Sequence, residues 1–258
     1  MNMVARLAVF DIDDTLLASN KRLLPSTIAS IQALKDRNIH VAIATGRNLA
    51  MARPVIEALK LRDYVLCNGS AAFADRKQVH QHTLSKANIG KLVAAADEQQ
   101  IDIVVESLDG LHIHTHPSSQ TRDVLNTFRA PTLDYAPDYY RNHDVYQAMM
   151  FYSDSQNQAL PHPDEFSFVR FHERGVDIIP KAGSKAQGIA KLAVALNVDV
   201  KNVAAFGDNE NDREMLQSAG IGVAMGNAKP AIKALADLTT TDCDHDGIAN
   251  GLKKIGWL

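Results

Sequence analysis

The sequence has little of the chemistry that marks disulfide-bonded, nucleic-acid-binding or membrane-spanning proteins. Only two of its 258 residues are cysteines, Cys67 and Cys243, and neither belongs to a metal-knuckle or disulfide pattern. The net charge is -3, and the lysines and arginines are scattered, so no basic patch is available for nucleic acid or an anionic membrane. No apolar run is long enough to span a bilayer, and the first residues lack the pattern of a signal peptide. We therefore expect a cytoplasmic protein whose partners include neither nucleic acid nor membrane.

What the chain does have is the composition of a globular protein. Its 46% hydrophobic and 22% charged residues argue against disorder, which requires low hydrophobicity and high net charge. A length of 258 residues allows either one large α/β domain or a main domain with a smaller one inserted. The sequence leaves open whether the protein is a monomer or a weak homodimer.

Strands and helices alternate in the first part of the chain. Residues 5–11 form a short apolar run that ends in carboxylates, which is typical of a buried parallel strand. A helix is expected from Pro25, followed by a strand at 40–44 and a later strand at 64–67. This alternation predicts an α/β fold, a Rossmann-like doubly wound parallel sheet with helices on both of its faces.

The pattern changes between residues 81 and 180. Two short apolar runs flank an Asp109-Gly110 turn, which is typical of a β-hairpin, and further strands are expected at 145–152 and 166–172. Hairpins imply antiparallel pairing, whereas the first part of the chain implies crossover connections. We therefore predict a separate α+β domain, inserted over residues 81–180.

The alternation of helices and parallel strands returns after the insertion. A helix is expected at 184–196, a strand at 203–206 and a closing helix from Lys229. The first domain is therefore interrupted by the inserted domain and resumes after it. We predict a discontinuous catalytic core that comprises residues 1–80 and 181–258.

Polar residues collect where the predicted parallel strands end. The first strand is followed by Asp11 and Asp13, the second by Thr45 and Gly46, and a later one by the acidic segment 208–212. Because ligands of open parallel sheets bind beyond the carboxyl ends of the strands, we expect these residues to share one crevice. Carboxylates that share a crevice repel one another unless a cation lies among them. Mg²⁺ is the expected cation, since it accepts few carboxylates and also takes a phosphate oxygen as a ligand.

Four ordered motifs in the chain resemble those of the haloacid dehalogenase (HAD) superfamily. They are Asp11-Ile12-Asp13-Asp14-Thr15, Thr45-Gly46-Arg47, Lys185, and Gly207-Asp208-Asn209-Glu210-Asn211-Asp212. The runs 219–228 and 246–249 are similar, more narrowly, to the Cof-type sugar-phosphatase branch, which carries a type IIB cap domain between the second and third motifs. The resemblance covers essentially the whole chain. It implies a phosphatase that acts on small phosphorylated metabolites, such as sugar phosphates or phosphorylated cofactors.

The resemblance also implies a role for each matched residue. Asp11 is the expected nucleophile, which forms an aspartyl-phosphate intermediate, and Asp13 is the expected general acid and base. The expected Mg²⁺ ligands are the carboxylates of Asp11 and Asp208 and the main-chain carbonyl of Asp13. Asp212 is expected to orient Lys185 or a metal-bound water. The groups expected to bind the phosphate are Thr45, Gly46, Lys185 and Asn211.

Alternative interpretations remain open. A phosphomutase shares this core and cap type but returns the phosphoryl group to its substrate. A catalytically idle phosphometabolite-binding protein would need a damaged site, whereas all four motifs are present. His112, His114 and His116 alternate along a predicted strand and could bind zinc, although a solvated or substrate-facing surface is better supported.

The sequence departs from the family pattern in the first motif and in the inserted domain. Asp14 stands where this branch often has glycine, which should alter the turn and leave catalysis intact. Residues 153–165 are rich in Asp, Ser, Gln and Pro where related caps have a longer helix. A shortened cap predicts a roomier and less selective site.

Overall fold

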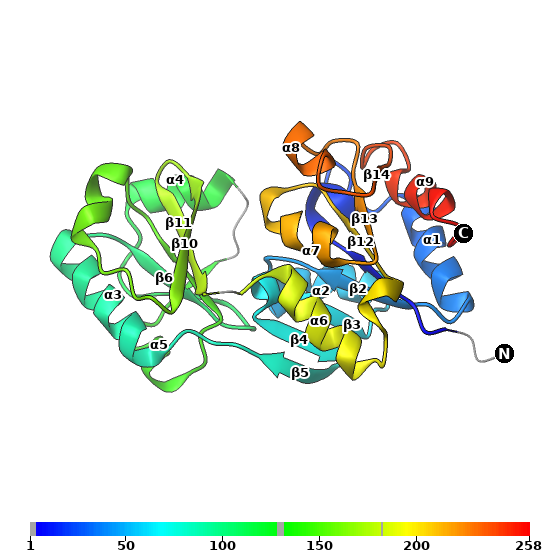
Figure 1. The fold of residues 1–258 in the computed structure, drawn as a ribbon. Coiled ribbons are helices and arrows are strands. Elements are labelled where there is room, and N and C mark those ends of the chain that lie inside the picture. Colours follow the sequence, from blue (N-terminus) through cyan, green and yellow to red (C-terminus); the bar gives the residue numbers. More distant parts are fainter. Residues whose placement is uncertain (1–3, 128–131, 182) are drawn as a thin grey trace. The chain divides into compact units, whose positions relative to one another are not determined.

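The chain divides into two compact units in a computed structural model that describes residues 4–127, 132–181 and 183–258. The first unit, called the core unit below, comprises Met1–Gly46, Ala52–Gln81 and Ser184–Leu258. The second unit, called the inserted unit, comprises Arg47–Met51 and His82–Gly183. Each unit has its own sheet (Figure 1) and its own apolar core.

The core unit is built on an eight-stranded sheet with the strand order β14-β13-β12-β1-β2-β3-β4-β5. Its strands are β1 (Leu7–Phe10), β2 (His40–Ala44), β3 (Asp63–Leu66), β4 (Ala71–Ala74), β5 (Lys77–Gln81), β12 (Val203–Gly207), β13 (Ile221–Ala224) and β14 (Leu238–Thr239). Pairing is parallel from β14 to β3 and antiparallel from β3 to β5. All four residues of the central strand β1 are fully buried, as a strand covered on both faces requires.

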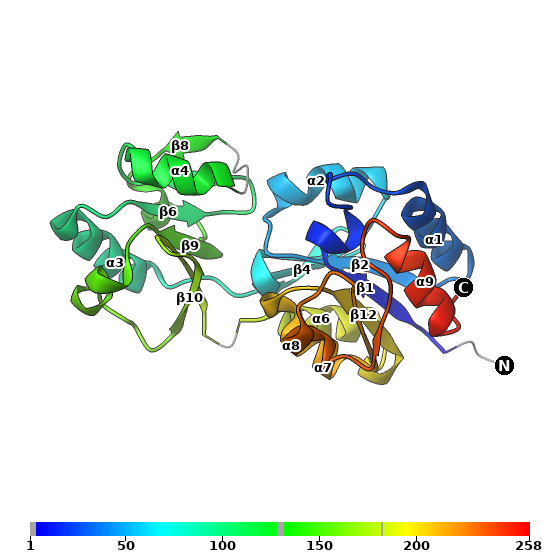
Figure 2. The ribbon, with the colours of Figure 1, turned by 90° about the horizontal axis from the view of Figure 1, so that it is seen from above.

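Helices cover both faces of this sheet. They are α1 (Pro25–Asp36), α2 (Leu49–Ala58), α6 (Lys185–Ala195), α7 (Arg213–Ser218), α8 (Pro230–Lys233) and α9 (Gly247–Lys254). Figure 2 shows α1, α2 and α9 on one face and α6 and α7 on the other. Ile189 and Leu192 of α6 belong to the same buried apolar cluster as Leu7 and Val9 of β1. The predicted α/β fold with a doubly wound parallel sheet is confirmed.

The register of the central strands brings their carboxyl ends together. Phe10 of β1 pairs with Ile43 of β2 on one side and with Phe206 of β12 on the other. The residues that follow these three positions therefore emerge at the same edge of the sheet. This edge is where the three polar motifs begin.

The inserted unit has a six-stranded sheet with the order β10-β11-β9-β6-β7-β8. Its strands are β6 (Ile103–Glu106), β7 (Leu111–Ile113), β8 (Leu133–Tyr135), β9 (Gln147–Met150), β10 (Phe166–His172) and β11 (Gly175–Pro180). Its helices are α3 (Lys86–Gln99), α4 (Ser119–Thr127) and α5 (Tyr139–Asn142). One apolar cluster joins α3 and α5 to one face of the sheet, and a second joins α4 to the other face. Pairing is antiparallel except between β7 and β8.

The closing part of the chain differs from the expectation. The helix predicted from Lys229 is a single turn, α8, after which the chain forms β14 and ends with α9. Pro230 starts α8, but Ile232 is its only fully buried side chain, so the turn has little apolar surface to extend it. No helix in the described part of the chain is both long and apolar enough to cross a membrane.

Candidate active site

Three carboxylates and one ammonium group meet at the carboxyl edge of the core sheet. Asp11, Asp208 and Asp212 each present an oxygen atom, and these oxygens lie within 4.8 Å of one another. Nζ of Lys185 donates to Oδ1 of Asp11 at 2.6 Å and to Oδ1 of Asp212 at 2.7 Å. Asp11, Asp212 and Lys185 are buried, and Asp208 is partly exposed. Within the described ranges, no other group of His, Cys, Asp or Glu side chains has this metal-binding proximity.

The parallel ladder positions Asp11 and Asp208. The Asp11 backbone N–H donates to the Phe206 carbonyl oxygen at 2.9 Å, which extends the pairing of β1 and β12 by one residue. Asp208 directly follows β12. Both carboxylates therefore project from strand ends whose positions are fixed by sheet hydrogen bonds, and such rigid supports suit groups that must hold a precise geometry.

Lys185 occupies the first turn of α6 and is 1% exposed. A cation at a helix N-terminus is opposed by the helix dipole, and burial of an ammonium group is costly without partners. The hydrogen bonds to Asp11 and Asp212 offset both costs. Lys185 is therefore a buried, hydrogen-bonded side chain, unlike the solvated lysines that are common on helix surfaces.

Asp212 holds the loop that carries Asp208. Its Oδ2 accepts from the backbone N–H groups of Asp208 at 2.9 Å and of Asn209 at 3.0 Å. A Cβ atom on Gly207 would lie 2.7 Å from that oxygen, so only glycine fits there. Since both oxygens of Asp212 already accept hydrogen bonds, its position suits the predicted orienting role toward Lys185.

The electrostatics of the cluster favour a divalent cation. Burial raises the pKa of Asp11 above its ordinary value, Lys185 lowers it, and Asp212 raises it further. Burial is also the main reason that the pKa of Asp208 rises to about 6. Three carboxylates and one ammonium group carry a net charge of -2 when ionised. Oxygen donors with this charge and spacing fit a hard divalent cation, which would keep Asp11 and Asp208 ionised.

Asp13 and Asp14, in the turn after β1, have non-helical backbone angles. The wide turn Ile12–Leu16 is interrupted at Asp13 (φ -76°, ψ 128°) and at Asp14 (φ 56°, ψ 16°). Asp14 is thus in the left-handed region, which glycine adopts at low cost and which is less favourable for a residue with a Cβ atom. The Asp13 side chain is 43% exposed, and Oδ1 lies 3.6 Å from Nζ of Lys21. Its carboxyl group is therefore open to solvent and lies beside Lys21.

The predicted phosphate-binding residues of the second and fourth motifs meet at one turn. Thr45 follows β2, and its backbone carbonyl oxygen accepts from the Asn68 N–H at 3.0 Å. Nδ2 of Asn211 donates to Oδ1 of Asn68 at 3.1 Å. The Asn68 amide also lies against Gly46, because a Cβ on Gly46 would be 3.2 Å from Oδ1 of Asn68. The structure therefore connects Thr45, Gly46 and Asn211 through a residue outside the four motifs.

Two further contacts to Asp208 were not predicted. The Thr15 hydroxyl donates to Oδ1 of Asp208 at 3.0 Å, and Nδ2 of Asn227 donates to Oδ2 at 3.3 Å. Asn227 also donates to the Asp14 carbonyl oxygen at 2.9 Å. Both residues lie inside runs that resemble the family, Thr15 in the first motif and Asn227 in 219–228. These two runs are the sequence signal from which a role of Thr15 and Asn227 near the site could have been predicted.

The alternating histidines of the inserted unit have separate partners. His112 and His116 stack on tyrosine rings, with centroids 3.5 and 4.4 Å apart, and Nδ1 of His114 lies 2.7 Å from the Pro137 carbonyl oxygen. They form no metal-ligand group among the described residues. The zinc interpretation is therefore not supported.

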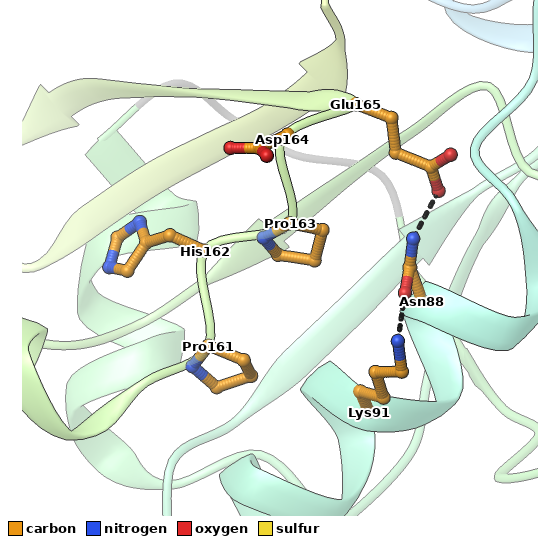
Figure 3. A pocket seen from close by; sticks show the side chains of 7 residues that line it. All are labelled: Asn88, Lys91, Pro161, His162, Pro163, Asp164 and Glu165. Atoms are coloured by element: carbon orange, nitrogen blue, oxygen red, sulfur yellow. Dashed lines mark hydrogen bonds between the residues drawn. The ribbon is translucent and has the colours of Figure 1, made fainter.

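A depression of about 470 Å³ lies in the inserted unit, lined by Asn88, Lys91, Pro161, His162, Pro163, Asp164 and Glu165 (Figure 3). Nδ2 of Asn88 donates to Glu165, and Nζ of Lys91 donates to Oδ1 of Asn88. Several of its polar groups thus bond to one another. None of the residues of the acidic cluster lines it.

Comparisons with known proteins find one matching family model and relatives that align over nearly the whole chain. Residues 8–252 match the model of a family described as haloacid dehalogenase-like hydrolase. A putative phosphatase of Bacillus subtilis, YkrA, is 33% identical, with 99% of this chain and 100% of that protein covered. The pyridoxal phosphate phosphatase YbhA of Escherichia coli is 29% identical, with 96% of this chain and 97% of that protein covered. A hypothetical protein of Geobacillus kaustophilus is 33% identical, with a TM-score of 0.94 and 98% and 100% of the two chains covered.

Proposed function

We propose that this chain, which belongs to the haloacid dehalogenase-like hydrolase family, is a magnesium-dependent phosphatase with Asp11 as its nucleophile. The family match confirms the resemblance of its motifs to the HAD superfamily and the Cof-type branch. Relatives that are named phosphatases support a phosphomonoesterase that acts on small phosphorylated molecules. The proposal adds a metal, a covalent intermediate and a role for each residue of the site.

One observation carries the proposal, namely the double hydrogen bond of Lys185 to Asp11 and Asp212 beside Asp208. A buried lysine holds one carboxylate while a second carboxylate stays partly open to solvent. Such an arrangement orients a nucleophile and favours its ionised form, and phosphoryl transfer depends mainly on positioning and charge stabilisation.

The proposed reaction has two displacements at phosphorus. A carboxylate oxygen of Asp11 attacks phosphorus, the bond to the leaving oxygen breaks, and Asp13 gives that oxygen a proton. Asp13 then removes a proton from water, whose oxygen attacks the aspartyl-phosphate and releases inorganic phosphate. Asp11 and Asp13 thereby return to their starting states. The groups that bind the phosphoryl oxygens are Thr45, Gly46, Lys185 and Asn211.

Mg²⁺ would be held by the carboxylates of Asp11 and Asp208 and by the main-chain carbonyl of Asp13. When bound, it supplies positive charge that offsets the negative charge of the phosphoryl oxygens and of the carboxylates. Thr15 and Asn227 support this role because both donate to Asp208 and limit its rotation.

The two parts of the chain have different proposed roles. Residues 1–80 and 181–258 serve as the catalytic core, and residues 81–180 serve as a cap domain that selects the leaving group. The substrates are sugar phosphates or phosphorylated cofactors in the cytoplasm. The named activities of the relatives, on pyridoxal phosphate and on 5-amino-6-(5-phospho-D-ribitylamino)uracil, belong to this range of small phosphate esters.

The test is a comparison of wild type with Asp11→Asn on a panel of phosphorylated metabolites. We expect wild type to release phosphate only with Mg²⁺, to lose activity with EDTA, and to recover it when Mg²⁺ is added back. Asp11→Asn should retain the fold by circular dichroism and lose at least about 10³-fold in kcat. Undiminished turnover by the variant would exclude the mechanism. Formation of a phosphate isomer without free phosphate would select a phosphomutase instead.

A further inference from the structure

A strained turn closes the third parallel strand at the same edge of the core sheet. Three consecutive residues after β3, Cys67, Asn68 and Gly69, have φ angles of 50°, 52° and 96°. The left-handed region is unfavourable for residues with a Cβ atom, and consecutive residues in this region are costly unless surrounding contacts hold them. The contacts of this turn therefore indicate which parts of the site depend on its unusual backbone conformation.

The turn is bonded to the second motif. Thr45 donates its backbone N–H to the Val65 carbonyl oxygen and accepts from the Asn68 N–H, both at 3.0 Å. The Asn68 side chain then covers Gly46, whose hypothetical Cβ would lie 3.2 Å from Oδ1 and 3.3 Å from Nδ2. The carboxamide of Asn68 is thus held against the backbone that is proposed to bind phosphate oxygens.

The same turn also contacts the third and fourth motifs. A Cβ on Gly69 would lie 1.9 Å from the carbonyl oxygen of Ser184, the residue before Lys185, so the turn packs directly on the start of α6. Oδ1 of Asn68 accepts from Nδ2 of Asn211 at 3.1 Å. One short turn therefore touches three of the four segments that build the site, although it belongs to none of them.

We propose that Asn68 is a positioning residue of the phosphate-binding site, which orients the Asn211 amide and the Gly46 backbone toward the substrate phosphoryl group. This inference rests on the proposed function, because it takes Gly46 and Asn211 as phosphate-binding groups. By accepting one hydrogen bond from Asn211, the Asn68 oxygen fixes which way that exposed amide faces. The left-handed backbone of residues 67–69 is the conformation that presents the carboxamide to both partners.

A neutral side chain is required at position 68. A phosphate monoester carries up to two negative charges, and a carboxylate beside its binding groups would repel it. Asn68→Asp keeps the shape and keeps an acceptor for Asn211, yet it adds that charge. If Asn68 had only a structural role, this nearly isosteric change would leave phosphate affinity unchanged.

The first experiment measures binding of inorganic phosphate in the presence of Mg²⁺ by isothermal titration calorimetry. We expect Asn68→Asp to raise the Kd for phosphate at least tenfold, and to raise KM for p-nitrophenyl phosphate by more than it lowers kcat. An unchanged Kd for phosphate together with an unchanged KM in Asn68→Asp would overturn the proposal.

The second experiment separates positioning from stability. Asn68→Gly removes the carboxamide and suits a φ of 52°, so the melting temperature should stay the same or rise while the Kd for phosphate rises threefold or more. Asn197→Gly is the matched control, because Asn197 also has a left-handed backbone (φ 55°) and is exposed at the end of α6. The control should bind phosphate like wild type. A fall in melting temperature that accompanies the loss of binding in Asn68→Gly would show a structural role and overturn the proposal.

Failure of this inference is distinguishable from failure of the proposed function. Full phosphate affinity in both Asn68 variants, with Asp11→Asn inactive, would reject the role of Asn68 and leave the phosphatase mechanism in place. Undiminished turnover by Asp11→Asn would reject the mechanism itself, whatever the Asn68 variants do.

Discussion

Nζ of Lys185 lies 2.6 Å from Oδ1 of Asp11, although 174 residues separate the two positions in the chain. The inserted unit lies within that interval. The core sheet brings them together because Asp11 directly follows β1 and because α6, which begins at Lys185, packs on the same sheet. The predictions below follow from this pair and from the carboxylates around it.

Replacement of Lys185 by methionine should impair both stability and activity. The variant leaves the buried Asp11 and Asp212 without their shared cation, so without Mg²⁺ the free energy of unfolding should fall by roughly 3 kcal/mol. Turnover should fall at least about 10²-fold, since the nucleophile loses its orienting partner. Urea denaturation and steady-state kinetics measure the two effects. Lys191→Met, at an exposed position of the same helix, is the control and should change neither. Equal stability and activity in the two variants would contradict the role of Lys185.

Replacement of Asp208 by asparagine should weaken metal binding before it affects the fold. The variant removes one of the two carboxylates proposed to bind Mg²⁺, so the Mg²⁺ concentration for half-maximal activity should rise at least about tenfold. A titration of activity against Mg²⁺ measures this change. Asp199→Asn is the control, because Asp199 is exposed and its carboxylate forms an ion pair with Lys201. An unchanged Mg²⁺ requirement in Asp208→Asn would exclude Asp208 as a ligand.

Replacement of Thr15 by valine should show whether its hydroxyl supports the metal site. The hydroxyl donates to Oδ1 of Asp208, so its loss should weaken Mg²⁺ binding by about threefold to tenfold. The free energy of unfolding should fall by about 1 kcal/mol. Thr240→Val is the control, because it also removes a buried hydrogen bond, from the Thr240 hydroxyl to the Gly247 carbonyl oxygen. The control should lose similar stability at unchanged Mg²⁺ affinity; a parallel loss of affinity in both would contradict the account.

Glu106 should make the stability of the protein depend on pH. Burial raises the pKa of Glu106 from 4.5 to about 8, against the lowering effect of its hydrogen bond from Gln147. Between these two pH values the folded state holds a proton that the unfolded state has released. The stabilisation is therefore complete below about pH 4.5 and is lost as the pH rises through 8.

Glu106→Gln removes this dependence, since its amide keeps the shape and does not titrate. At pH 8 the variant should be more stable than wild type by roughly 1 to 3 kcal/mol, and the difference should shrink toward pH 5. Urea denaturation at several pH values measures it. Glu98→Gln, at an exposed position of α3, should show no such trend. A constant difference between Glu106→Gln and wild type across this range would show that Glu106 is ionised throughout.

The sequence predicts those parts of the fold and site that depend on local pattern. The apolar runs that became β1 and β2 are short, buried on both faces and followed by polar motifs, so their ends are visible in the sequence. Strand β10 likewise begins and ends where its alternation predicts. Parallel strands place their carboxyl ends at one edge, and this rule is enough to gather Asp11 and Asp208.

Other features depend on contacts that no local pattern records. Strands β4 and β5 extend the core sheet by a hairpin, and the exposed residues of β5 give little apolar signal. The burial of Lys185 follows from two carboxylates distant in sequence, so its side chain alone resembles any helix lysine. The contacts of Asn68 depend on three successive left-handed residues, and an Asn-Gly pair after a strand predicts only a turn.

The central claim is that Asp11 itself accepts the phosphoryl group, and chemical trapping tests it most directly. Wild-type enzyme is mixed with Mg²⁺ and a phosphomonoester that it hydrolyses, and the reaction is quenched in acid during steady state. The protein is then reduced with borohydride and digested for mass spectrometry. We predict conversion of Asp11 to homoserine, which marks an acyl phosphate at that residue, and its absence in Asp11→Asn. Active turnover with an unmodified Asp11, or with the modification at another carboxylate, would contradict the account.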